Sequence, residues 1–226
     1  MSERIFAIRP EPGLSATIAA GRAAGLEIEG CPLFDIRPVA WEAPPPDEID
    51  ALLIGSANAV RHGGPDLAQY HGKPAFAVGK TTAQVLKAAG FPIAAVGKGG
   101  LQPMLDALAG RSLRLLRLSG VEHLPVAEPQ GITLVTRIVY DAIALPMPPE
   151  LAAALASGGV TLLHSGAAAS HFAAEYDRAG LDRSAMKLAA LGPRIAHAAG
   201  SGWREVRSAA APREAAILAL ALDMCH

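Results

Sequence analysis

The chain has 226 residues, of which 51% are hydrophobic, 18% charged and 4% aromatic. This length suits one large domain or two of about 110 residues each, and the apolar content excludes a disordered chain. The 20 basic and 21 acidic residues give a net charge of −1. That balance argues against a nucleic-acid partner, because such binding depends on a clustered basic face.

Short apolar runs alternate with helical patterns along nearly the whole chain. They predict buried strands at residues 5–8, 51–54, 75–78, 113–116, 161–164 and 188–191. Helices are predicted at residues 15–24, 82–89, 104–109 and 167–179. Glycines that suit helix C-termini follow them at Gly25, Gly90, Gly110 and Gly180. This alternation predicts βαβ units and therefore an α/β fold with parallel sheets.

The second half of the chain repeats the pattern of the first. Residues 51–56 resemble residues 161–165, and residues 77–79 resemble residues 190–192, at a spacing of about 110 residues. The segment that begins at Gly25 resembles the one that begins at Gly131 in the same way. Each copy supplies enough strands for a five-stranded sheet of the flavodoxin type.

Two proline-rich stretches, at residues 43–46 and 146–149, interrupt this pattern, whereas residues 109–111 form only a tight loop. Proline clusters are typical of stiff spacers between domains. We therefore predict two flavodoxin-like parallel-sheet domains joined by a two-stranded linker, with a ligand cleft between them. The first, discontinuous domain comprises residues 1–36 and 147–226, the second comprises residues 41–140, and the linker comprises residues 37–40 and 141–146.

Two glycine-rich segments resemble nucleotide-binding motifs but lack required residues. Gly79, Lys80 and Thr81 could end a P-loop, but Pro74 stands where that motif needs a glycine. Residues 97–100 lack the third glycine of a dinucleotide fingerprint, because position 102 is Gln102. No closely spaced group of histidines and carboxylates predicts a metal site.

Five turns between strands and helices are built from small polar residues, at residues 56–58, 79–82, 119–120, 165–166 and 192–193. Free backbone amides at a helix start carry a partial positive charge and suit carboxylates or phosphates. Any single turn of this kind is also explained by ordinary N-capping. Five in one chain favour a shared cleft lined with anion-binding groups.

Three further side chains are candidates for that cleft. Arg9 and Arg117 each follow an apolar strand, where a guanidinium group could pair with a ligand carboxylate, although both could also serve the fold alone. Tyr140 lies in the predicted linker strand, as a packed residue or as a hydroxyl that reaches the cleft. His164, next to Ser165, is more simply explained as a hydrogen-bonded histidine at the sheet edge.

The ordered set of these motifs resembles the uroporphyrinogen-III synthase family over essentially the whole chain. The matching segments are residues 9–11, 32–38, 53–60, 77–83, 116–120, 139–140 and 190–193. The resemblance implies a cytoplasmic lyase without a cofactor or metal. Its substrate would be hydroxymethylbilane, a linear tetrapyrrole with eight carboxylates, which it would cyclise to uroporphyrinogen III with loss of water and inversion of ring D.

The resemblance also assigns roles to individual residues. Tyr140 would assist departure of the hydroxyl, and Thr82 would line the cleft. Turn residues would meet substrate carboxylates. The expected contacts are Arg9, Ser56, Ala57, Asn58, Thr82, Arg117, Gly120, Ser165, Gly166 and Gly192. We expect a monomer with no nucleic-acid or membrane partner.

The chain departs from the family pattern at Ile195, where a hydroxyl residue is frequent, and in the alanines that follow Gly166. These departures leave an inactive family member as one alternative. Another alternative is a non-catalytic intracellular two-domain binder or sensor of a small carboxylate or phosphate. The amino terminus has no long apolar core of the kind that a signal peptide needs. The two cysteines, Cys31 and Cys225, form no CxxC pair, which indicates a reducing compartment.

Overall fold

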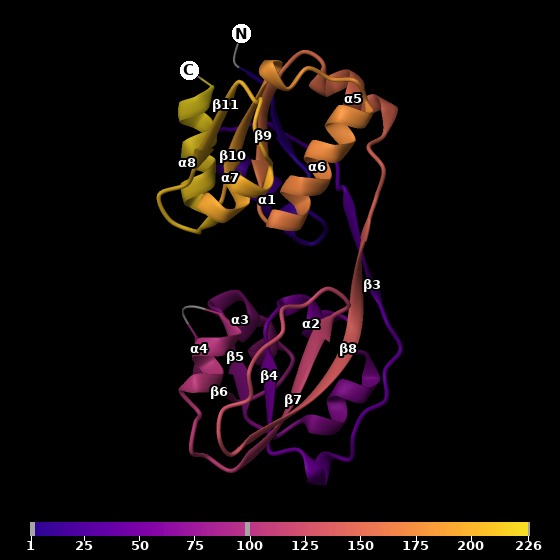
Figure 1. Cartoon of the computed structure of the whole chain (residues 1–226), viewed down its shortest axis with the longest axis vertical. Coiled ribbons are helices and arrows are strands. Elements are labelled where there is room, and N and C mark those ends of the chain that lie inside the picture. Colours follow the sequence, from indigo (N-terminus) through magenta and orange to yellow (C-terminus); the bar gives the residue numbers. More distant parts are fainter. Residues whose placement is uncertain (1–2, 98–99, 226) are drawn as a thin grey trace. The chain divides into compact units, whose positions relative to one another are not determined.

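The structure, a computed structural model, describes residues 3–97 and 100–225. The chain forms two compact units (Figure 1). Unit 1 comprises Met1–Asp35 and Ile143–His226, and unit 2 comprises Ile36–Ala142. The chain leaves unit 1 through β3 (Phe34–Pro38) and returns through β8 (Ile132–Ala144), and these two strands are hydrogen-bonded neighbours. Both units consist of a sheet with helices, which confirms the predicted α/β class.

Unit 1 contains a five-stranded sheet in the order β11-β10-β9-β1-β2, with every pairing parallel. Its strands are β1 (Ile5–Ala7), β2 (Ile28–Gly30), β9 (Gly159–Leu163), β10 (Met186–Ala190) and β11 (Glu205–Ser208). Its helices are α1 (Gly13–Ala23), α5 (Pro149–Leu155), α6 (Gly166–Arg178), α7 (Pro193–Ala198) and α8 (Glu214–Met224), with a short 3-10 helix at Arg183–Ala185.

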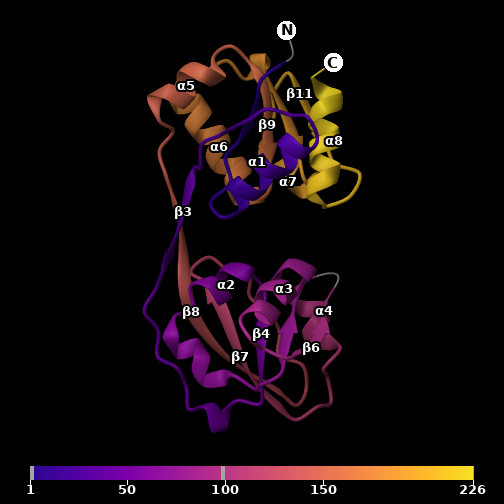
Figure 2. The same cartoon turned by 180° about the vertical axis from the view of Figure 1, so that it is seen from behind.

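Alternate residues of the central strands of unit 1 belong to two separate cores. Ile5 and Ala7 pack with α1 and α8, whereas Phe6 and Ile8 pack with α5, α6 and α7. Figures 1 and 2 show these two helix layers from opposite sides. Because successive side chains of a strand point to opposite faces, an entirely apolar strand requires helices on both sides of the sheet.

Unit 2 contains the sheet β3-β8-β7-β4-β5-β6, in which the pairings from β8 to β6 are parallel. Its other strands are β4 (Ala51–Ile54), β5 (Ala75–Ala77), β6 (Ile93–Val96) and β7 (Leu113–Gly120). The helices are α2 (Ala57–Arg61), α3 (Lys80–Ala88) and α4 (Leu101–Asp106), with 3-10 helices at Pro46–Glu48 and Pro65–Tyr70. One face of the sheet packs with α2 and α3, and the other packs with α4.

All six predicted strands are present, but the ends of several strands and helices differ from those predicted, most at β7 and α4. The strand predicted to end at residue 116 continues to Gly120, because Arg117 and Ser119 interrupt the apolar run without ending the pairing with β8. The helix predicted at residues 104–109 begins at Leu101, because Pro103 is tolerated in a first turn, where the amide needs no partner.

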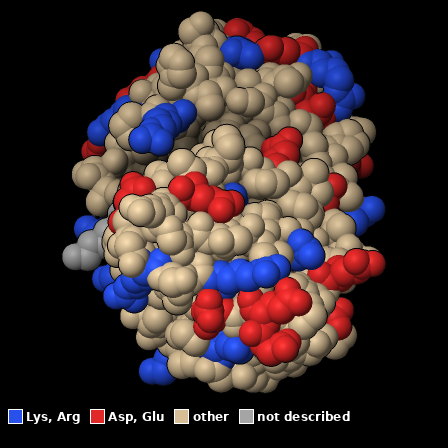
Figure 3. Space-filling view, turned by 60° about the horizontal axis from the view of Figure 1, so that its bottom comes forward, with Lys and Arg blue, Asp and Glu red and all other residues tan. Residues whose placement is uncertain are grey.

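The predicted glycine termini agree with the backbone. Gly25, Gly90 and Gly180 each follow the last residues of a helix with φ of 77°, 85° and 69°, in the left-handed region that disfavours other residues. Gly110 has φ of 79° in the turn before β7. Among the described residues, no helix is both long and apolar enough to span a membrane. Basic and acidic side chains are interspersed over the face that Figure 3 draws.

A network of charged groups ties α8 to the sheet of unit 1. Glu214 accepts hydrogen bonds from Thr17 Oγ1 at 2.6 Å and from Arg9 Nη1 at 3.1 Å, and His164 Nε2 lies 3.3 Å from its Oε1. Burial alone would raise the pKa of Glu214, but the bonds from His164 and Thr17 and the charges of His164 and Arg9 lower it to about 2. The carboxylate is therefore ionised at every physiological pH.

Glu214→Gln should reduce the free energy of unfolding at pH 7 by about 2 kcal/mol, because the bonds from Arg9 and His164 lose a charged acceptor. The folded-state pKa lies below the ordinary 4.5, so this stabilisation is complete above pH 4.5 and declines as pH falls toward 2. Urea unfolding at pH 7, 5 and 3.5 measures the difference. Glu205→Gln is the control, because its side chain is 38% exposed and only 3.8 Å from Arg207 Nη1, so its effect should be within about 0.5 kcal/mol. A pH-independent difference for Glu214→Gln would contradict this account.

Candidate functional site

The predicted site residues belong to the loops that follow the parallel strands. The carboxyl ends of parallel strands share one edge of a sheet, and ligands of open α/β folds bind at that edge. In unit 1 this carboxyl edge has Arg9, Ser165, Gly166 and Gly192, after β1, β9 and β10. In unit 2 it has Ser56, Ala57, Asn58 and Thr82, after β4 and β5, Gly120 at the end of β7, and Tyr140 opposite Gly120 within β8. Arg117 is the exception.

The turn after β4 is a regular N-cap. Ser56 has an extended backbone, and its hydroxyl accepts the amide of Asn58 at 3.2 Å. Asn58 also accepts a hydrogen bond from Arg61 Nη1 through Oδ1 at 3.1 Å. Ala57 is buried beneath the turn. Ser56 and Asn58 are half-buried, so both remain accessible at the edge.

The turn after β5 starts α3 at Lys80, with Gly79 as an extended N-cap. The first amides of a helix have no intrahelical acceptor, so this turn presents backbone donors at the edge. Thr82 lies in the same turn, but its side chain is only 6% exposed. The structure therefore places Thr82 beneath the edge rather than on its surface.

Tyr140 and Gly120 lie directly against each other where β7 ends and its pairing with β8 stops. They are paired across the two strands, and a Cβ atom on Gly120 would lie 2.7 Å from Cε2 of the Tyr140 ring. The ring of His62, at the end of α2, lies with its centroid 6.3 Å from that of Tyr140. The Tyr140 side chain is half-buried, and its hydroxyl forms no hydrogen bond among the described residues. It is thus a free donor at the edge.

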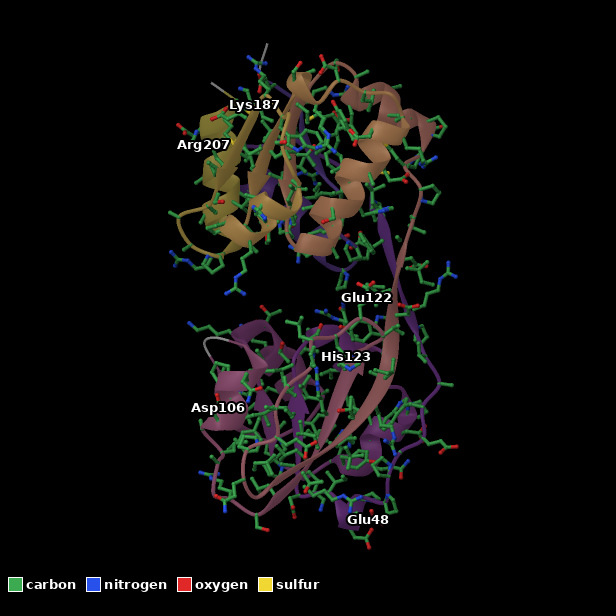
Figure 4. All side chains as sticks on the ribbon, viewed as in Figure 1. Glu48, Asp106, Glu122, His123, Lys187 and Arg207 are labelled. Atoms are coloured by element: carbon green, nitrogen blue, oxygen red, sulfur yellow. The ribbon has the colours of Figure 1, made fainter. Side chains whose placement is uncertain are left out.

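Arg117 lies inside the sheet, because β7 continues past it to Gly120 and is therefore longer than predicted. It is 4% exposed, and Nη2 donates to the carbonyl of Leu124 at 2.8 Å, while Nε has no partner among the described residues. Burial lowers the pKa of the Arg117 guanidinium. The expectation that Arg117 ends a strand at the edge is wrong. Through Leu124 the side chain instead contacts the loop after β7, in which Figure 4 labels Glu122 and His123.

In unit 1, Arg9 is half-buried at the carboxyl edge, and its Nη1 is bound to Glu214 and Thr17. The sequence pattern missed Glu214 as its partner, although an acidic residue in the first turn of α8 was a signal. The structure thus gives Arg9 a role in the fold, and any ligand carboxylate that it met would compete with the Glu214 carboxylate.

The starts of α6 and α7, which follow β9 and β10 in unit 1, differ in their exposed groups. Ser165 caps α6 by accepting the amide of Ala168 at 3.2 Å, which leaves the amides of Gly166 and Ala167 without an intrahelical acceptor. Gly192 precedes α7 with an extended backbone and open space around its Cα. Ile195 packs partly into the core beneath α7, so its position suits an apolar side chain.

His164 adds an unpaired polar atom to this edge. Its side chain is 6% exposed, and Nδ1 has no hydrogen-bond partner among the described residues, whereas Nε2 faces Glu214. The prediction of a fully hydrogen-bonded edge histidine therefore holds for one ring nitrogen only. Within residues 3–97 and 100–225, no three histidine, cysteine or acidic side chains gather closely enough to hold a metal ion.

Comparisons with known proteins point to one family. The family model described as uroporphyrinogen-III synthase HemD matches residues 15–219. Among solved structures, uroporphyrinogen-III synthetase from Helicobacter pylori is similar with a TM-score of 0.67 and 16% identity, covering 98% of this chain and 99% of that one. A mutant uroporphyrinogen III synthase from Thermus thermophilus is similar with a TM-score of 0.56 and 18% identity, covering 98% of both chains. No curated protein sequence matches the chain.

At these identities the solved structures establish a shared fold, and the family model carries the assignment. It spans both units and contains every candidate site residue except Arg9. The predicted resemblance is therefore confirmed, and the alternative of a non-catalytic sensor is not favoured. The chain belongs to the uroporphyrinogen-III synthase family, a family of lyases in tetrapyrrole biosynthesis.

Proposed function

We propose that the chain converts hydroxymethylbilane to uroporphyrinogen III, and that Tyr140 donates a hydrogen bond or proton to the departing hydroxyl. The observation that carries the residue assignment is the position of Tyr140, half-buried at the carboxyl edge of unit 2 with a hydroxyl that is unpaired among the described residues. A leaving hydroxyl needs such a donor, because it departs as water.

The substrate determines what the remaining contacts must supply. Eight carboxylates require many hydrogen-bond donors, and no single strong base is needed. We propose that the bilane is bound from the carboxyl edges by Arg9, Ser56, Ala57, Asn58, Gly120, Ser165, Gly166 and Gly192, and from beneath the edge of unit 2 by Thr82 and Arg117. Backbone amides at the starts of α3 and α6 support this proposal, since they are directed donors with a favourable helix dipole.

The two arginines would act differently in this scheme. Arg9 shares its guanidinium with Glu214, so a substrate carboxylate would compete with an existing ion pair. Arg117 has a buried guanidinium whose hydrogen bond goes to a neutral carbonyl, so its positive charge beneath the edge of unit 2 would favour an anion above it. Catalysis would then consist of holding the reacting ends of the bilane together and stabilising loss of water.

The topology supports a finer proposal, that each unit is a flavodoxin-like domain and that the two are joined by a two-stranded linker. Counted in chain order, the sheet of unit 1 has the flavodoxin-like order 2-1-3-4-5. The strands β8-β7-β4-β5-β6 have the same order when β7 is counted first. In this order the ligand crevice lies between strands 1 and 3, which places Arg9 and Ser165 beside it in unit 1, and Gly120 and Ser56 in unit 2.

We further propose domains at residues 1–36 with 147–226 and at residues 41–140, with residues 37–40 and 141–146 as the linker. Two chain crossings would permit a hinge motion rather than free tumbling. We also propose that the protein acts as a monomer in the cytoplasm without a cofactor. The family assignment supports an enzyme without a cofactor, and the balanced charge of −1 argues against a nucleic-acid partner.

The purified protein should direct freshly generated hydroxymethylbilane to isomer III, because the free substrate closes spontaneously to isomer I without inversion of ring D. Oxidation of the products and chromatographic separation of the two isomers measure the ratio. A reaction without protein is the control. Formation of isomer I alone, at the rate of that control, would refute the proposed activity.

Tyr140→Phe should lower kcat about 100-fold and leave KM nearly unchanged, because it removes a donor that acts on the leaving group. The free energy of unfolding should change by less than about 0.5 kcal/mol, since the lost hydroxyl has no partner in the fold. Initial rates of isomer III formation and urea unfolding test both expectations. An unchanged kcat would remove Tyr140 from the mechanism.

A further inference from the structure

Where its pairing with β7 ends, β8 carries one extra residue relative to β7. The two strands pair regularly as far as Ser119 and Ile138, and then Gly120 pairs with Tyr140, so that Val139 has no opposite residue. Such a β-bulge is rare in a parallel pair. Bulges are concentrated near active sites, where they redirect a side chain.

The bulge changes the face to which Tyr140 belongs. Successive side chains of a regular strand point to opposite faces of the sheet. Val139 and Tyr140 are consecutive, yet both pack with the core cluster that includes residues of α2 and α3. The extra residue therefore turns Tyr140 onto the face that Gly120 shares with Leu118 and Leu116, two and four residues earlier in β7.

The phenol ring of Tyr140 occupies the space in which any residue other than glycine at position 120 would have its Cβ atom. A Cβ atom at Gly120 would lie 2.7 Å from Cε2, 2.8 Å from Cζ and 3.1 Å from the hydroxyl oxygen of Tyr140. Gly120 is not among the glycines with positive φ, so its backbone conformation is open to other residues. Within the described structure, the demand for glycine at position 120 comes from the ring of Tyr140.

Neighbouring groups hold both partners in place. The amide of Val121 donates to the carbonyl of Tyr140 at 3.0 Å. The Nδ1 atom of His123 lies 2.9 Å from the carbonyl oxygen of Gly120, in the turn that Figure 4 labels. His62 lies at the end of α2 with its ring 6.3 Å from the phenol ring, at an interplanar angle of 40°.

We infer that Gly120 is a positioning residue for Tyr140. The bulge places the phenol ring against the Cα of Gly120, which has no side chain, and this contact orients the hydroxyl toward the reacting atoms. This inference rests on the proposed function and deepens it. The role is distinct from a contact between the Gly120 amide and substrate, since it acts through the position of Tyr140. Any side chain at position 120 must displace the ring, and a displacement of about 1 Å can cost 100-fold in rate.

Gly120→Ala tests this inference through kinetics. We expect kcat for isomer III to fall 10- to 100-fold, with KM changed less than about twofold. The contacts that bind the substrate remain, but the Tyr140 hydroxyl is no longer oriented toward the leaving group. In a Tyr140→Phe background, Gly120→Ala should cause no further fall in kcat, because the misplaced hydroxyl is already absent. An unchanged kcat, or an equal fall in both backgrounds, would overturn the inference.

A second readout needs no activity. Ring signals of the three tyrosines can be recorded by carbon–proton NMR, and loss of one signal in Tyr140→Phe assigns Tyr140. Gly120→Ala should shift that signal, whereas the signals of the fully buried Tyr70 and Tyr176 should stay unchanged. Gly55→Ala is the matched control at the same edge, because its Cβ would meet only the side-chain tip of Leu101 at 3.2 Å, and it should leave the Tyr140 signal in place.

The NMR result separates this inference from the proposed function, since a protein that makes no isomer III can still show the shift. An unmoved Tyr140 signal in Gly120→Ala would overturn the positioning role. If Gly120→Ala does not fold, Gly120→Ala combined with Tyr140→Ala should restore folding, because the ring that clashes is gone. Failure of that rescue would also overturn the inference.

Discussion

Parallel pairing of strands is the constraint on which the rest of the structure depends. It requires each connection to cross from the carboxyl end of one strand to the amino end of the next, and so it collects the candidate loops at one edge of each sheet. Apolar strands such as Ala51–Ile54 and Gly159–Leu163 are buried on both faces. The polar residues Ser56 and Ser165, which follow these strands, can therefore lie only at the edge, where they cap helices and leave backbone amides free.

The charges at these edges suit an anion whose binding is spread over many weak contacts. Arg9 forms an ion pair with Glu214, and Arg117 is buried and donates to a carbonyl. Neither arginine therefore has an exposed guanidinium group ready for a bidentate pair with a carboxylate. The donors that remain are mainly backbone amides, which are fixed by the helices and need no reorganisation to bind a carboxylate. A site of this kind fits the proposed substrate, a flexible octa-anion that has to be held in one conformation, and would not need a hydroxyl residue at Ile195.

The sequence allowed the class of fold and the family to be predicted because both depend on patterns that repeat along the chain. Buried strands, glycine termini and the repeat at about 110 residues are local or periodic signals. The errors arose where a polar residue is buried: Arg117 and Ser119 ended the apolar run, although β7 continues beneath the loop after it. The same limit hid the pairing of Arg9 with Glu214, because the two residues are far apart in the sequence and meet only in the fold.

The position of Tyr140 could be predicted only in part. Its residue type and its motif indicated a functional hydroxyl, but Val139-Tyr140 has the composition of any regular strand. Nothing in that composition indicates that one residue is skipped in the pairing with β7. A bulge is decided by the energetics of two strands together with the core beneath them, so a single strand does not reveal it.

We propose that backbone amides at the carboxyl edges of the sheets bind the substrate. Amide NMR of the whole chain during titration with uroporphyrinogen III, kept reduced, tests it most directly. We expect the amide signals of Gly120 and Gly166, at the carboxyl edges, to shift with ligand concentration. Gly131 and Gly158, which precede β8 and β9 at the amino edges, should keep their positions. Shifts confined to Gly131 and Gly158 would contradict the account.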